Sequence, residues 1–175
     1  MSKSNRDKFV PKAHWPIHND YLIEIGRMAV LWGYLESAME KYIAKLMGVD
    51  EFSDPRPAIV IAHMSFKQRQ DALTSLCALQ CEEHPHLADY RKVMDMIDKA
   101  SKGRNKFVHG NLGRNPDDGK HYLFSMSARG QLKFSSEVVY VADVLEVTKK
   151  IHEALAALHN LVTDADHAPL WDRPD

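Results

Sequence analysis

The sequence predicts a mainly α-helical domain with a small β-hairpin inserted before its last helix. Apolar residues recur every three or four positions over residues 20–47, 87–109 and 141–162, which is the period of an amphipathic helix. Residues alternate in polarity on both sides of Ala128-Arg129-Gly130, which indicates a hairpin at about 121–136. The 175 residues, 45% of them hydrophobic, suit one domain with a sizeable core.

The first helix is expected from Asp20 to Met47. Asn19 or Asp20 could cap its start and Gly48 could end it. One apolar stripe runs along its whole length, namely Ile25, Met28, Trp32, Leu35, Met39, Tyr42 and Leu46. A second apolar set lies on other sides, namely Leu22, Ala29, Leu31, Ala38 and Ile43. A helix that is apolar on more than one side is either central to the fold or faces a second chain.

Two more main helices are expected before the hairpin. After a Pro- and Asp-rich loop over 52–57 and a short apolar segment over 58–64, Ser65 and Gln68 form a capping-box signature that predicts a helix start. Pro85 then breaks the chain, and a third helix is expected from about Leu87 to His109.

Turn-forming residues set the remaining boundaries. Gly110 is a plausible stop for the third helix, and residues 111–120, rich in Asn, Gly, Pro and Asp, are expected to form a loop. The helical domain then covers residues 19–163. Residues 1–18 are expected to form a flexible basic arm, and residues 164–175 a frayed tail.

Composition excludes several classes of protein. The net charge of −1 gives no overall attraction for nucleic acid or an anionic membrane, so a polyanion site would have to be a local patch. No apolar run approaches the roughly 20 residues that span a bilayer, and the basic N-terminus lacks the apolar segment of a signal peptide. Two cysteines are too few for a disulfide framework, and the expected location is a reducing cytoplasm. The sequence contains neither a P-loop nor a dinucleotide-binding fingerprint, so no cofactor is expected, and no membrane partner is expected.

One group of residues has the composition of a zinc site. Cys77 and Cys81 are one helical turn apart and are followed by His84 and His86. Pro85 makes convergence of the four side chains awkward. Burial of the cysteines as small apolar residues is therefore the preferred interpretation, and no metal site is predicted.

Arg104 interrupts the apolar stripe of the third helix. That stripe consists of Tyr90, Val93 or Met94, Ile97 and Ala100 or Ser101, and Arg104 occupies its next position. Burial of an unpaired guanidinium is costly, so Arg104 should either meet a carboxylate or face a polar cleft. Glu36, in the apolar part of the first helix, is the best candidate partner.

The polar residues around Arg104 lie on a different stripe. Lys102, Asn105 and His109 are spaced by three and four residues and share one side of the helix. Arg104 and His109 are five residues apart, about 140° around a straight helix. Two copies related by a symmetry axis could bring both groups together, which favours a site shared between subunits.

The segment Arg104-Asn105-Lys106-Phe107-Val108-His109 resembles the signature of the HEPN superfamily, in which a polar residue follows an arginine and four to six residues separate that arginine from a histidine. Four residues separate Arg104 from His109. The first helix, with Glu36 in Trp32-Gly33-Tyr34-Leu35-Glu36, is similar to the helix of that superfamily whose acidic residue contacts the arginine. The resemblance covers most of residues 20–162 in layout but only about a dozen residues in motif. It implies a HEPN-like bundle of four to five helices.

Two other segments have an arginine-to-histidine spacing within the same range, each with six intervening residues. Arg56 to His63 begins with Arg-Pro in an expected loop, and Arg114 to His121 contains Pro116 and is not expected to be helical. Only the match at Arg104 lies at the end of a strong amphipathic helix.

The resemblance implies a metal-independent endoribonuclease in which the RNA 2′-hydroxyl attacks the adjacent phosphate. His109 would be the general acid or base, and Arg104 would hold the phosphate. Asn105 would orient one of them and Glu36 would fix Arg104. Lys102 and Lys106 would attract the RNA backbone. The resemblance also implies a homodimer, formed through the first and third helices, and a toxin–antitoxin or defence role with a cognate antitoxin as possible partner.

A second interpretation stays open. Arg104 and Glu36 could form a structural ion pair, and His109 could interact favourably with the helix C-terminus. The protein would then be a catalytically inactive HEPN-like helical dimer that binds a partner protein or a nucleotide.

Overall fold

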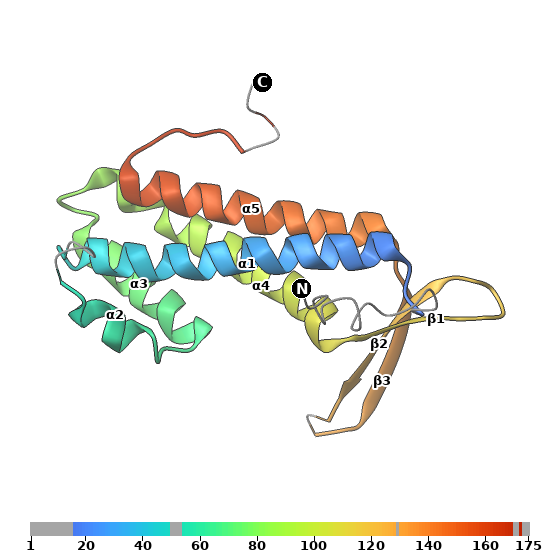
Figure 1. The fold of residues 1–175 in the computed structure, drawn as a ribbon. Coiled ribbons are helices and arrows are strands. Elements are labelled where there is room, and N and C mark those ends of the chain that lie inside the picture. Colours follow the sequence, from blue (N-terminus) through green and yellow to red (C-terminus); the bar gives the residue numbers. More distant parts are fainter. Residues whose placement is uncertain (1–15, 50–53, 129, 170–171, 173–175) are drawn as a thin grey trace, which may run out of the picture.

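The computed structural model describes residues 16–49, 54–128, 130–169 and 172. Helices dominate this part of the chain, and a small antiparallel sheet precedes the last helix, so the predicted fold class is confirmed in outline (Figure 1). The elements in chain order are α1 (Asn19–Leu46), α2 (Arg56–Ile61), α3 (Phe66–Gln80), the 3₁₀ helix η2 (Pro85–Asp89), α4 (Tyr90–His109), β1 (Asn111–Arg114), β2 (His121–Ser127), β3 (Lys133–Val138) and α5 (Val141–Thr163).

The core lies between the four long helices. α1 and α5 run side by side, α4 packs on α5, and α3 packs on α1 (Figure 1). The largest fully buried side chains come from all four, among them Met28, Leu35, Leu73, Ile97, Ile151 and Leu158. Each such side chain contributes roughly 1.5–3 kcal/mol through burial. The apolar stripe predicted for α1 is the side of that helix that enters the core.

The helix starts agree with the sequence at α3 and differ at α1. The capping box is confirmed, because the Gln68 backbone N–H donates to Ser65 Oγ at 3.3 Å and the Ser65 N–H donates to Gln68 Oε1 at 2.7 Å. At α1 the capping residue is His18, without a side-chain hydrogen bond, so the predicted cap by Asn19 or Asp20 is wrong. Its end is as expected, since Gly48 has a φ of +73° that favours glycine.

The segment around Arg56 also differs from the expectation of a loop. α2 begins at Arg56, and Pro57 stands in its first turn, where a missing backbone N–H costs no hydrogen bond. The predicted third helix likewise divides into η2 and α4, which meet at Tyr90.

The sheet has the order β1-β2-β3, with both pairs antiparallel. The hairpin predicted at 121–136 corresponds to β2 and β3. The loop predicted over 111–120 is partly wrong, because its first four residues form β1 and pair with β2. Asn and Gly are poor strand formers, so pairing with β2, and not local preference, holds this strand.

Gly110 sets the sheet against the end of α4. A Cβ atom at this position would lie 2.6 Å from the Lys106 carbonyl oxygen and 2.7 Å from Leu123 Cδ1. Leu123 is the buried residue of β2. The close approach that glycine permits therefore lets the sheet begin directly after the helix, at one end of the bundle (Figure 1).

The structure describes only part of the two predicted terminal segments. Of the predicted basic arm, residues 1–15 lie outside the described residues, whereas Ile17 is partly buried and the His18 backbone N–H donates to His121 Nε2 at 3.3 Å. After α5, the Asn160 side chain makes two hydrogen bonds with the backbone of His167. In the described part of the chain, no helix combines the length and apolar character needed to cross a membrane.

Candidate functional site

The Arg104 side chain is half-buried where α4 faces α1. Its guanidinium lies over the Trp32 ring, 5.3 Å from the ring centroid. Trp32 is buried and packs in turn on Phe66, at a centroid distance of 4.8 Å. Three elements thus build this position: α4 carries the arginine, α1 the tryptophan beneath it, and the first residue of α3 the next ring.

Arg104 does not pair with Glu36, which corrects the sequence-based expectation. Among the described residues Arg104 has no ion pair; its Nη1 donates to Asn105 Oδ1 at 3.0 Å, and its buried Nε has no hydrogen-bond partner. Glu36 instead lies 3.8 Å from Arg69, whose Nη2 is 2.9 Å from Glu40.

The helix packing explains why Glu36 contacts Arg69 and not Arg104. α1 packs extensively on α5 and α3 but touches α4 only slightly. Arg69, on α3, therefore reaches Glu36, the carboxylate that was expected to pair with Arg104 on α4. Sequence reasoning missed this ion-pair network. Its signal was Arg69, a basic residue that interrupts the apolar face of α3.

The two lysines proposed to attract RNA are engaged within the chain. Lys102 Nζ lies 2.6 Å from Asp98, and this hydrogen bond raises the pKa of the lysine. Lys106 Nζ lies 2.9 Å from Glu137 on β3. Both side chains remain substantially exposed, so they stay available to an anion but add less net positive charge than two unpaired lysines.

His109 is the last residue of α4 and is exposed. Asn105, one turn earlier on the helix, is also exposed. Arg104 points toward α1, and the five-residue offset puts His109 about 140° away around the helix. The chain therefore joins Arg104 and Asn105 by a hydrogen bond but leaves His109 on another side of α4. A single copy does not direct both reacting groups at one atom.

The four residues with the composition of a zinc site differ in burial. Cys77 is buried, Cys81 and His86 are half-buried, and His84 is exposed. Cys77 is fully buried, and burial raises the pKa of its thiol to about 11. Cys81 is half-buried, and its Sγ lies 3.3 Å from the Ala78 carbonyl oxygen. Within the described ranges, no group of three or more His, Cys, Asp or Glu side chains could hold a metal ion.

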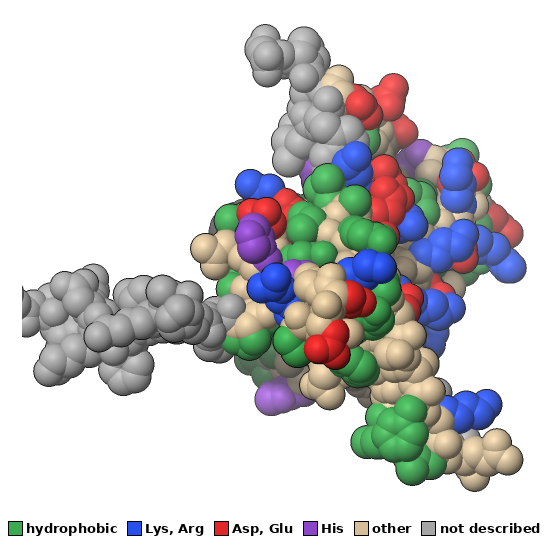
Figure 2. All heavy atoms as spheres, turned by 90° about the vertical axis from the view of Figure 1, so that its right-hand side faces the viewer, with side chains coloured by type: hydrophobic (Ala, Val, Ile, Leu, Met, Phe, Trp, Pro, Cys, Tyr) green, Lys and Arg blue, Asp and Glu red, His purple; other side chains and the backbone are tan. Residues whose placement is uncertain are grey.

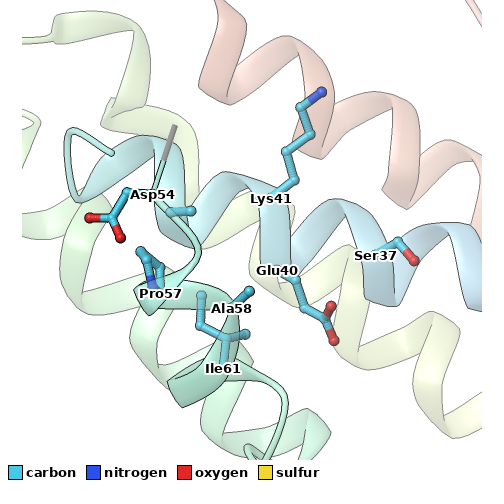
Figure 3. Close-up of a pocket in the computed structure, with 8 residues that line it drawn as sticks. Ser37, Glu40, Lys41, Asp54, Pro57, Ala58 and Ile61 are labelled. Carbon is cyan, nitrogen blue, oxygen red and sulfur yellow. The ribbon is translucent and has the colours of Figure 1, made fainter. Parts of the chain in front are cut away.

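A hollow of about 140 Å³ lies between α1 and α2 (Figure 3). Glu40 and Asp54 supply its carboxylates, and Pro57, Ala58 and Ile61 its apolar lining. The Asp54 carboxylate is bound by Arg56, and these hydrogen bonds lower its pKa to about 2. Glu40 is engaged by Arg69. Both carboxylates are thus paired, and the hollow contains none of the residues predicted for the site.

No family model, no curated protein and no solved structure matches the chain. The chemistry of the site is therefore the basis for a functional proposal.

Proposed function

We propose that this protein is a metal-independent endoribonuclease of HEPN type that acts as a homodimer. In the proposed reaction the RNA 2′-hydroxyl attacks the adjacent phosphorus, its proton passes to a base, and the 5′-oxygen of the next nucleotide leaves with a proton. The products are a 2′,3′-cyclic phosphate and a free 5′-hydroxyl.

The observation that carries the proposal is the state of Arg104. A half-buried guanidinium without a carboxylate partner among the described residues retains hydrogen-bond donors for an incoming anion. Its planar fork suits two phosphate oxygens, and the guanidinium lies over the Trp32 ring. A lysine at this position would supply charge without that geometry.

His109 and Asn105 complete the proposed chemistry. A histidine imidazole can serve as general acid or base near neutral pH, and His109 is exposed to solvent. Asn105 holds Arg104 through its Oδ1, so it is proposed as a positioning residue. Glu36 has no part in this scheme, because Arg69 engages it.

The dimer is proposed to form through the outer face of α1, next to α4. This face, named here the α1 outer face, exposes apolar side chains with glycines between them, namely Leu22, Ile23, Gly26, Val30, Gly33 and Tyr34. A Cβ at either glycine would meet no atom within 4 Å. A second helix could approach closely here, and a two-fold axis could bring His109 of one copy towards Arg104 of the other.

The test is RNA cleavage in EDTA by the full-length chain. Arg104→Ala and His109→Ala should each lower the rate by at least about 100-fold, the usual contribution of a general acid or base or of a charge-stabilising group. Arg91→Ala is the matched arginine control, since Arg91 lies over the Tyr90 ring on the same helix. His63→Ala is the control for an exposed histidine.

Two outcomes would overturn the proposal: no cleavage by the wild type of structured or unstructured RNA, or cleavage that needs a divalent metal. If the protein acts as a toxin, expression of the wild type should arrest growth, whereas expression of His109→Ala should not.

A catalytically inactive dimer that binds a partner protein is the second candidate. It is favoured by the local neutralisation of Lys102 and Lys106, which weakens attraction for RNA. Under this alternative Arg104→Ala would impair partner binding while no preparation cleaves RNA.

A further inference from the structure

β3 presents an unpaired edge to solvent. It is the last strand of the sheet, and among the described residues no backbone group hydrogen-bonds to its outer side. Five of its six residues are exposed, and it contains neither proline nor a bulge over its paired length. Natural proteins usually protect such an edge, because its free N–H and C=O groups are a template for another strand.

The ladder with β2 fixes which groups of β3 point outward. The Val139 N–H donates to the His121 carbonyl at 3.0 Å, so residues 121 and 139 form a hydrogen-bonded pair. Such pairs alternate along an antiparallel ladder. Ser135 and Glu137 are therefore bonded to β2, whereas Phe134, Ser136 and Val138 direct their backbone groups to the free edge.

We propose that the free edge of β3 pairs in antiparallel orientation with β3 of a second copy, about a two-fold axis at Ser135. Phe134 then faces Ser136 of the second copy and Ser136 faces Phe134, so two hydrogen-bonded pairs form with four backbone hydrogen bonds. The two three-stranded sheets become one six-stranded sheet. This contact is separate from the α1 outer face and does not depend on ribonuclease activity.

Charge selects this register from the others that the edge allows. With the axis at Ser135, each Lys133 faces a Glu137 in a non-hydrogen-bonded pair, where opposing side chains are closest. An axis at Ser136 would place Glu137 opposite Ser135. An axis at Glu137 would place the two carboxylates opposite each other. The strand is thus complementary to itself in one register.

The exposed side chains support the same pairing. Phe134 is 73% exposed and Met126, its neighbour on β2, is 68% exposed. Figure 2 shows the hairpin projecting from the body of the molecule with apolar side chains at its end. In the proposed register the two Phe134 rings are diagonal neighbours on one face, within reach of each other. Glu137, bound to Lys106 at 2.9 Å but half-exposed, would lie between that lysine and Lys133 of the second copy.

The test uses full-length chains that carry Val30→Arg, which removes association through the α1 outer face. Sedimentation should show a concentration-dependent dimer. Lys133→Glu or Glu137→Lys places like charges opposite each other, and each should weaken association by about tenfold or more. An equimolar mixture of the two variants restores opposite charges and should dimerise again. Lys120→Glu, an exposed lysine outside β3, is the control.

Amide hydrogen exchange gives a second measurement. Exchange at Phe134 and Ser136 should slow as the protein concentration rises, while Ser135, already bonded to β2, should change little. A monomeric Val30→Arg chain at millimolar concentration, or single variants that associate as strongly as their parent, would overturn the proposal. So would a mixture that stays monomeric. None of these results bears on RNA cleavage.

Discussion

Arg104 is partly removed from water without a neutralising carboxylate among the residues that the structure describes, and its surroundings explain how this is tolerated. A guanidinium is weakly hydrated and flat, so stacking on an indole replaces part of its lost hydration. Such cation–π contacts contribute about 0.5–2 kcal/mol, depending on exposure. The hydrogen bond to Asn105 satisfies one further donor. Among the described residues its buried Nε has no hydrogen-bond partner.

Cys77 leads to a prediction about alkaline stability. Burial raises the pKa of its thiol from 9.0 to about 11, so the folded state holds the proton more tightly than the unfolded chain. This stabilising difference is fully present below pH 9 and is lost as the pH rises towards 11, by an amount on the order of 2–3 kcal/mol. Denaturant unfolding at pH 8 and pH 11 should show the loss.

Cys77→Ala should lower stability at pH 8 through the small cavity it creates, and it should remove much of this additional loss above pH 9. An equal pH dependence in the wild type and in this variant would contradict the assignment to Cys77.

At the scale of elements, Gly110 determines how α4 gives way to β1. At Gly110 there is no space for a methyl group, because the Lys106 carbonyl oxygen and the Leu123 side chain both lie against this residue. The sheet is thereby held close to the last turn of α4, the turn that carries His109.

Gly110→Ala should destabilise the protein by about 1–3 kcal/mol, because the new methyl group overpacks against backbone and a buried leucine. Gly113→Ala is the control, because a Cβ there would meet only Phe124 Cε2 at an ordinary contact distance of 3.7 Å, and it should stabilise by up to about 1 kcal/mol. Chemical denaturation of both variants measures the difference. A neutral Gly110→Ala would mean that the junction is able to relax.

Elements with a strong local signal could be predicted from the sequence. The long period-3.6 stripes gave the main helices, and Ser65 with Gln68 gave the start of α3. β1 could not be found in this way, since its residues adopt a strand only because β2 lies beside them. The prediction that Glu36 pairs with Arg104 was wrong for a related reason. Periodicity identifies the buried side of a helix but not which neighbouring helix covers it.

At the scale of the whole molecule, apolar exposure is unevenly distributed. The N-terminal half of α1 presents the α1 outer face, whereas the outer side of α4 carries mostly charged residues. Association through α1 is therefore the favoured form of the expected homodimer, with α4 beside the contact and not at its centre.

Val30→Arg should shift the chain towards smaller species, because it places a charge in the middle of the α1 outer face, where Val30 is 57% exposed. Val60→Arg is the matched control on α2, where the valine is 63% exposed. Sedimentation over a range of concentrations compares the two. Equal masses for the wild type and both variants would exclude this face as the dimer contact.

The stacking of Arg104 on Trp32 also has an optical consequence. The chain has three tryptophans, and replacing Trp15 and Trp171 with phenylalanine would leave Trp32 as the sole indole emitter. A cation held against an indole ring perturbs its excited state, so any anion that moves the guanidinium should alter the emission of this residue. The protein thus contains an intrinsic fluorescent reporter at the position where substrate is proposed to bind, readable without a label and without catalysis.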